Sequence, residues 1–180
     1  MNPFIKILLF SLLTASFALS AFADDFKVKT FNDGKMTLKW KLEGANIHII
    51  FGAKNQGKGW VGLGFNDKKV MTDGDFVVGF VKGAKGEVVE HFGKGPSKHD
   101  EKPGKGDLIS SKVYVEGDMT MIEFVRPLKG SNPKSKPLVA NGENKMMLSF
   151  ADAPRFSKKH EIKDVVFFSI NFTTGDVKNL

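Results

Sequence analysis

Three side chains of this chain combine a metal-binding residue type with a local setting that invites explanation. Met71 lies in the polar segment 67–75, where most neighbours are charged or small. Its thioether therefore either caps the edge of a core or acts as a soft metal ligand. His48 lies mid-strand between two isoleucines and is expected to face outward or to be a satisfied, half-buried residue. His160 follows two lysines and, taken alone, has the setting of a solvated loop histidine.

The remaining two histidines lie close together in the sequence. His91 and His99, with Asp100 and Glu101, carry donors for a metal ion, although their spacing fits no standard pattern. The chain has no nucleophile elbow, zinc-protease motif, P-loop or dinucleotide fingerprint. It also has no cysteine, which excludes thiolate nucleophiles, iron–sulfur clusters and c-type haem attachment. Any haem would have to be held without covalent bonds.

The elements that must position these residues are predicted to be β-strands. The chain has 180 residues, which suits one domain, and it shows no sustained helical periodicity. Short apolar or alternating runs separated by Gly and Asx residues predict an all-β sandwich or barrel. Residues 93–106 and 127–142, rich in Gly, Pro and polar residues, are expected to be surface loops. The predicted strands cover residues 26–31, 36–42, 46–53, 59–65, 75–81, 87–92, 108–115, 119–125, 145–150 and 165–172.

The N-terminal segment differs from the rest. Met1–Ala23 contains a cationic Lys6, an apolar run and an A-x-A site before Asp24, which predicts a secretory signal peptide. Residues 24–180 would then form a single domain that is periplasmic or secreted, with no stable membrane span after cleavage. The formal net charge of +7 comes from scattered lysines, which disfavours nucleic acid as a partner.

Several motifs together resemble the DOMON domain family. A G-W-V-x-L-G strand precedes a short loop with a Met, and a D-x-V-V-G strand follows it. A polar-Asp-Leu step, an F-x-R-P-L ending and a histidine before the last strand continue the resemblance over most of the chain. The matching residues are Gly59–Asn66, Met71, Asp75–Phe80, Gly106–Leu108, Phe124–Leu128 and His160.

This resemblance implies an immunoglobulin-like β-sandwich and, as in some family members, a b-type haem bound without covalent attachment. In haem-binding members a loop Met and a C-terminal His are the axial ligands, and the matching residues here are Met71 and His160. Met/His ligation raises the reduction potential and fills both axial positions. Candidate cofactor contacts near these ligands in sequence are the aromatic residues Trp60, Phe65, Phe76 and Phe156 and the lysines Lys69 and Lys159. Core packing is the alternative for each aromatic residue and is favoured for Trp60. The lysines could pair with the haem propionates or could equally be solvated loop residues.

The preferred hypothesis is an exported electron carrier that is no enzyme by itself and docks to an acidic redox partner protein. His91 and His48 remain open as alternatives to His160 for the second ligand, because the sequence around His160 lacks glycines expected there. A carbohydrate- or ligand-binding module on the same sandwich is the competing function. A divalent-metal site at His91 and His99 is a third.

Overall fold

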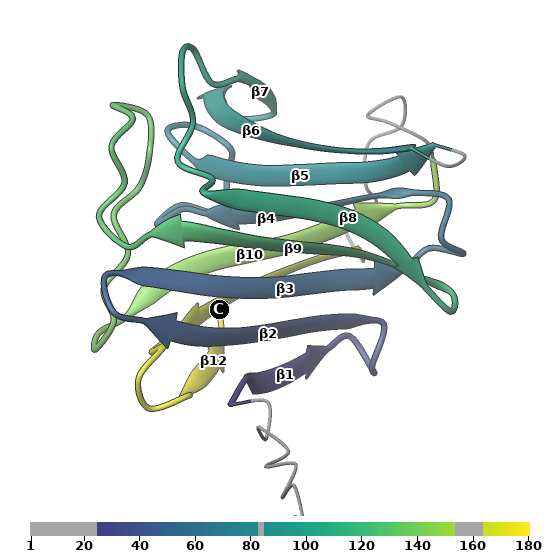
Figure 1. Ribbon diagram of the computed structural model, residues 1–180, viewed down its shortest axis with the longest axis horizontal. Coiled ribbons are helices and arrows are strands. Elements are labelled where there is room, and N and C mark those ends of the chain that lie inside the picture. Colours follow the sequence, from purple (N-terminus) through teal and green to yellow (C-terminus); the bar gives the residue numbers. More distant parts are fainter. Residues whose placement is uncertain (1–24, 83–84, 154–163) are drawn as a thin grey trace, which may run out of the picture.

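The computed structural model describes residues 25–82, 85–153 and 164–180, and these residues form twelve β-strands (Figure 1). Every pairing between them is antiparallel. The strands are β1 (Lys27–Phe31), β2 (Met36–Glu43), β3 (Asn46–Lys54), β4 (Trp60–Phe65), β5 (Asp75–Lys82), β6 (Lys85–Gly95), β7 (Lys98–Glu101), β8 (Ser110–Glu116), β9 (Met119–Pro127), β10 (Asn144–Ala151), β11 (Val165–Ile170) and β12 (Val177–Asn179).

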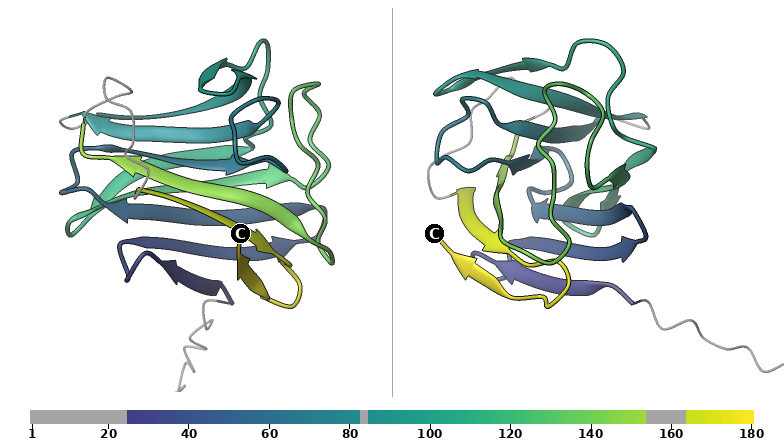
Figure 2. Two further views of the ribbon diagram at one scale, coloured as in Figure 1. Left: turned by 180° about the vertical axis from the view of Figure 1, so that it is seen from behind. Right: turned by 90° about the vertical axis from the view of Figure 1, so that its left-hand side faces the viewer.

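The strands form two sheets that pack face to face. One sheet has five strands in the order β1-β2-β3-β9-β8, and the other has seven in the order β12-β11-β10-β4-β5-β6-β7. The five-stranded sheet lies in front in Figure 1, and the side view in Figure 2 shows the two layers. The predicted all-β sandwich is therefore confirmed.

The predicted strands are all present, with shifts of a few residues at their ends, but two short strands were not predicted. The expectation that residues 93–106 form a loop is wrong in its first half, because β6 continues to Gly95 and β7 pairs with it. A short, charged edge strand carries no apolar alternation, so the sequence pattern could not reveal it. The three-residue β12 is a similar case.

The main core lies between the sheets and follows the two-residue period of the strands. In β2, Met36, Leu38 and Trp40 are almost fully buried, as their alternation predicts. From the other sheet, Val61 and Leu63 of β4 point into the same core. These residues occupy the inner face of each sheet.

β4 and its neighbour β5 are buried on both faces. Every residue of β4 is buried, and Phe76, Val78 and Phe80 of β5 are buried although they point away from the main core. A strand that faces solvent on one side normally alternates between apolar and polar residues. The continuous apolar sequence of β4 and β5 therefore marks a second apolar layer outside the sandwich.

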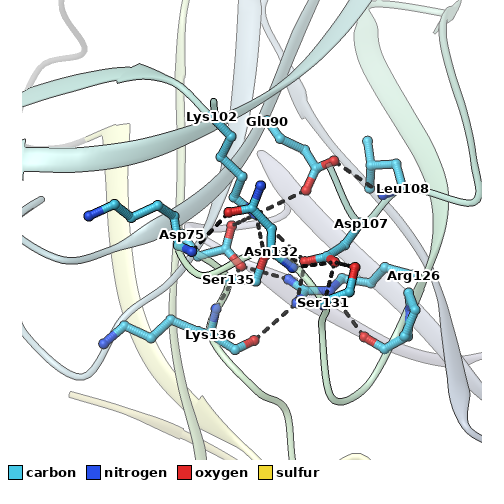
Figure 3. A network of polar contacts seen from close by, with 12 residues as sticks. Asp75, Glu90, Lys102, Asp107, Leu108, Arg126, Ser131, Asn132, Ser135 and Lys136 are labelled. Atoms are coloured by element: carbon cyan, nitrogen blue, oxygen red, sulfur yellow. Dashed lines mark hydrogen bonds and ion pairs between the residues drawn. The ribbon is translucent and has the colours of Figure 1, made fainter. Parts of the chain in front are cut away.

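A buried ion pair joins the two sheets at one end of the sandwich (Figure 3). Asp75, the first residue of β5, accepts a hydrogen bond of 2.8 Å from the guanidinium of Arg126 on β9, and both side chains are fully buried. Lys102 Nζ lies 2.7 Å from the other Asp75 carboxylate oxygen and 3.0 Å from Glu90. The pair is thus part of a buried ionic cluster formed by Asp75, Glu90, Lys102, Asp107 and Arg126.

The same cluster holds two surface loops against the strands, one between β7 and β8 and one between β9 and β10. Asp107 accepts hydrogen bonds from the backbone and hydroxyl of Ser131 and from the hydroxyl of Ser135. The backbone amide of Lys136 donates to Asp75, while its carbonyl accepts from Arg126. Buried charges need such partners, and both loops therefore have a fixed position at this end of the sandwich.

We expect Asp107→Asn to weaken the fold in a pH-dependent way. Burial alone would raise the pKa of the Asp107 carboxyl, but hydrogen bonds from Ser135 and Ser131 outweigh burial and lower that pKa to about 2. Because the folded-state pKa lies below the ordinary value of 3.8, the ionised carboxylate stabilises the fold above that value, and this stabilisation is lost as the pH falls through about 2.

Denaturant unfolding at several pH values measures this effect. The variant should be less stable than the parent by about 2 kcal/mol at pH 7, and the difference should shrink towards pH 2. Asp118→Asn, at an exposed turn, is the matched control and should leave stability nearly unchanged. A penalty that is the same at pH 7 and pH 3 would show that the charge of Asp107 does not contribute.

Candidate functional site

The outer side of the seven-stranded sheet carries an unusual apolar surface, here called the outer apolar face. Cross-strand pairing brings its members side by side, because Phe76 lies opposite Gly64, and Gly64 lies opposite Met147. Two buried clusters form it, with half-buried side chains packed around the second. The face consists of Trp60, Phe80 and Ala151 in one cluster and of Phe76, Val78 and Met147 with Met71, Val89, Val165 and Phe167 in the other.

Two glycines of β4 lie at the centre of this face. A Cβ atom at Gly64 would lie 2.7 Å from a side-chain carbon of Met147 and 2.7 Å from the Phe76 ring, and one at Gly62 would lie 2.8 Å from Val78. The absence of side chains at both positions lets the neighbouring apolar groups approach each other over the sheet. The side chains of Met147, Phe76 and Val78 therefore fill the space over these two glycines.

Met71 lies at the edge of this face, in the loop between β4 and β5. Its side chain is half-buried and packs against the cluster around Phe76. The amide side chain of Asn66 donates to the carbonyls of Val70 and Thr72, and the Gly74 amide donates to the Met71 carbonyl over 2.9 Å. These bonds fold the loop back on itself and aim an apolar thioether at the sheet from an otherwise charged segment.

The hairpin of β6 and β7 fixes the Met71 loop from the other side. The Met71 amide donates to the Pro96 carbonyl over 3.1 Å, and the Asp73 amide donates to the Gly93 carbonyl, also over 3.1 Å. A Cβ atom at Gly93 would lie only 1.5 Å from the Met71 carbonyl oxygen, so this contact requires glycine. Met71 is thus held by two separate parts of the chain.

Two of the four histidines lie on the same side of the sheet as Met71. His91 pairs with Phe76 across β5 and β6, and the ring of His99 lies 5.9 Å from the Phe76 ring, centre to centre. The Nδ1 atoms of His91 and His99 are 2.5 Å apart. Burial, and secondarily the charge of His99, lower the pKa of His91 to about 4, so His91 is neutral at pH 7.

His48 lies elsewhere, on the outer side of the five-stranded sheet. Its ring is half-buried against Phe26, and its Nε2 lies 3.0 Å from Glu123. This matches the outward-facing, satisfied residue expected from the sequence. Because the two sheets separate His48 from the Met71 loop, these two residues cannot bind one metal ion in this fold.

The predicted aromatic residues divide between the two faces of the sheet. Phe76 contributes to the outer apolar face beside Met71. Trp60 is also on this side and is buried there with Phe80, rather than in the main core, which had been the stronger expectation for it. Phe65 is not brought to this face, because the pleat of β4 points it into the main core, where it lies under the Arg126 guanidinium.

The other predicted residues are exposed or undescribed. Lys69 is exposed in the Met71 loop. Phe156, Lys159 and His160 lie outside the described residues, as does the predicted signal peptide. Among the described residues, no helix is long and apolar enough to span a membrane.

Sequence reasoning missed most of the outer apolar face. Met147, Val165 and Phe167 lie far from Met71 in the sequence and meet it only through strand pairing. The signal available in the sequence was the continuous apolar character of β4 and β5, which indicates burial on both faces. Sequence motifs could not supply the register that brings β10 and β11 to the same place.

The comparisons with known proteins agree with this fold. No curated protein sequence matches the chain. The cytochrome domain of Myriococcum thermophilum cellobiose dehydrogenase superposes with a TM-score of 0.63 at 14% identity, covering 84% of this chain and 85% of that one. The cytochrome b domain of pyranose dehydrogenase from Coprinopsis cinerea gives a TM-score of 0.62 at 9% identity, covering 83% of each chain.

The family comparison covers both sheets of the sandwich. The model of the DOMON domain matches residues 32–152, which extend from the turn after β1 to just beyond β10 and include Met71 and the buried ionic cluster. The chain therefore belongs to the DOMON domain family.

Proposed function

We propose that this domain is a b-type cytochrome that carries single electrons outside the cytoplasm. The observation that carries the proposal is the placement of the Met71 thioether at the edge of an apolar sheet face. A porphyrin needs apolar walls, and iron accepts a thioether as an axial ligand. The fold shared with two cytochrome domains supports the same proposal.

The described residues fit a haem. The outer apolar face offers large apolar side chains beside Met71, and a porphyrin needs such a wall. Outer sheet faces in sandwiches are normally polar, so the apolar residues at this face are the candidates for the porphyrin wall. The absence of cysteine is compatible with a haem held only by such contacts and axial ligands.

Met71 would serve as one axial ligand and His160 as the other. The bonds from Asn66 and from the β6–β7 hairpin keep the Met71 backbone in place, so little reorganisation is needed when the oxidation state changes. When bound, the haem would supply a one-electron iron couple, and Met/His ligation would raise its potential. With both axial positions taken, the domain would carry electrons without catalysing a reaction of its own.

The loops around Met71 suit an acidic redox partner. Exposed lysines come from the Met71 loop, from the β6–β7 hairpin and from the segment after β9, and only some of them pair with a neighbouring carboxylate. Complementary charge speeds the encounter of redox proteins more than it tightens their complex. The exposed lysines at this end include Lys68, Lys69, Lys94, Lys98, Lys129 and Lys134.

Carbohydrate binding has less support. Sugar sites commonly present exposed aromatic rings, whereas the exposed large hydrophobic residues in the described parts of the chain are all aliphatic. A groove of about 260 Å³ lies beside Asn66, Lys136 and Asn144, but the single aromatic residue that lines it, Phe65, is buried. The electron-carrier function is therefore preferred.

The first test replaces the proposed thioether ligand by a side chain of similar size. Met71→Leu keeps the apolar packing but removes the sulfur, so the haem-loaded protein should lose its six-coordinate low-spin spectrum and show a lower reduction potential. Absorbance spectroscopy of the reduced protein and a potentiometric titration measure both effects.

Met146→Leu provides the matched control, because Met146 is buried in the main core on the other face of the same sheet. It should leave the spectrum and the potential unchanged. An unaltered spectrum in Met71→Leu would exclude Met71 as a ligand. Separate His160→Ala and His91→Ala variants identify the second ligand by the same measurement, and His160→Ala should give the larger change.

A second test concerns the apolar wall. Phe76→Leu removes a ring from the outer apolar face, and the rate of haem transfer to apomyoglobin should rise roughly fivefold, since aromatic contacts contribute about 1 kcal/mol beyond their buried area. Phe65→Leu makes the same change on the inner face of the sheet. It should lower the unfolding temperature without raising the transfer rate at temperatures where the protein is folded. Equal transfer rates for the two variants would contradict a haem on the outer face.

A further inference from the structure

The buried ionic cluster contains more negative than positive groups. Its three carboxylates belong to Asp75, Glu90 and Asp107 and its two cations to Lys102 and Arg126, so two positive and three negative charges leave a formal charge of −1. Each of these side chains is at most 9% exposed. The cluster therefore places one net negative charge inside the protein.

Neutral donors stabilise this excess charge. The Leu108 amide donates to Glu90 over 3.1 Å, while Ser135 and Ser131 donate to Asp107. Burial alone would raise the pKa of Asp107, but these hydrogen bonds lower it to about 2, so Asp107 is ionised at pH 7. Hydrogen bonds to the charged form of a carboxyl group favour that form.

The cluster and Met71 lie on opposite faces of the same strands. Asp75 points between the sheets, whereas the next residue, Phe76, points outward and packs with Met71 on the outer apolar face. Glu90 lies opposite the core residue Val77 in the pairing of β5 with β6, so its carboxylate is on the inner face as well.

Buried protein separates the cluster from the Met71 thioether. Residues 74–80, which connect the two, are all buried. Charges in such surroundings interact through a lower effective dielectric constant than surface charges do, and salt screens them less. The negative charge of the cluster therefore acts on any charge that develops beside Met71.

We propose that the buried ionic cluster lowers the reduction potential of a haem bound at Met71. The oxidised iron carries one more positive charge than the reduced iron, so a fixed negative charge stabilises the oxidised form. Thioether ligation acts in the opposite direction and raises the potential. This inference rests on the proposed function and concerns one electron, exchanged with the redox partner protein without a proton.

Two substitutions that change the charge of the cluster in opposite directions test the proposal. Glu90→Gln removes a negative charge and keeps an acceptor for the Leu108 amide, so the potential of the haem-loaded protein should rise. Asp107→Asn removes a negative charge as well and should raise it too. Lys102→Gln removes a positive charge and should lower it. Each change should alter the equilibrium constant for reduction roughly tenfold, or about 59 mV for one electron, as for charges ~10 Å apart at an effective dielectric constant of ~20.

Glu101→Gln is the matched control, because Glu101 directly precedes Lys102 but is exposed on the edge strand β7. Water and salt screen a surface charge, so this variant should shift the potential much less. A merely structural disturbance would move Glu90→Gln and Lys102→Gln in the same direction in a potentiometric titration. That result, or no shift in either variant, would overturn the inference.

A measurement on the haem-free protein separates this inference from the proposed function. Because the chain has no cysteine, Met71→Cys introduces a single thiol, which can be converted to a thiocyanate whose nitrile stretching frequency reports the local electric field. Adding Glu90→Gln or Lys102→Gln should shift this infrared band in opposite directions, and adding Glu101→Gln should leave it nearly unchanged. A parent protein that takes up no haem would overturn both proposals. A haem-binding protein with coincident nitrile bands in these variants would overturn this inference alone.

Discussion

The ion pair between Asp75 and Arg126 is the interaction on which the rest of the structure depends. Taking both charges out of water is costly, and only close partners offset that cost. Because Asp75 must point between the sheets to reach Arg126, the next residue, Phe76, must point outward. One buried carboxylate therefore sets which face every residue of β5 presents. It also places the end of the Met71 loop, which lies immediately before it.

The family motifs acquire a physical meaning from this cluster. The aspartates of the D-x-V-V-G strand and of the polar-Asp-Leu step, and the arginine of the F-x-R-P-L ending, converge as Asp75, Asp107 and Arg126. They lie far apart in the sequence, and neither spacing nor charge pattern indicates that they meet. The charged residues of these motifs thus build the scaffold, whereas Trp60, Met71 and Phe76 of the same motifs contribute to the outer apolar face.

The sandwich could be predicted from the sequence because the main strands carry strong apolar patterns, as β2 does with Met36, Leu38 and Trp40. The candidate site was predictable in part. Met71 was prominent because it is apolar among charged neighbours, and Phe76 because it is close to Met71. Placing Phe65 on the inner face required knowing which residues of β4 point inward. Bringing His91 next to His99 required the register of the charged β6–β7 hairpin. Such long-range pairings are set by the whole sheet, and a short segment does not encode them.

The outermost strands have a consequence for the behaviour of the protein in concentrated solution. Unpaired edges of β-sheets invite other chains to add as further strands and so initiate aggregation. Here β1 and β8 border one sheet and β7 and β12 the other, and their exposed positions carry mostly polar or charged residues. β7 reads Lys-His-Asp-Glu, and β1 places two lysines along its edge. Polar and charged side chains at these borders oppose the addition of further strands.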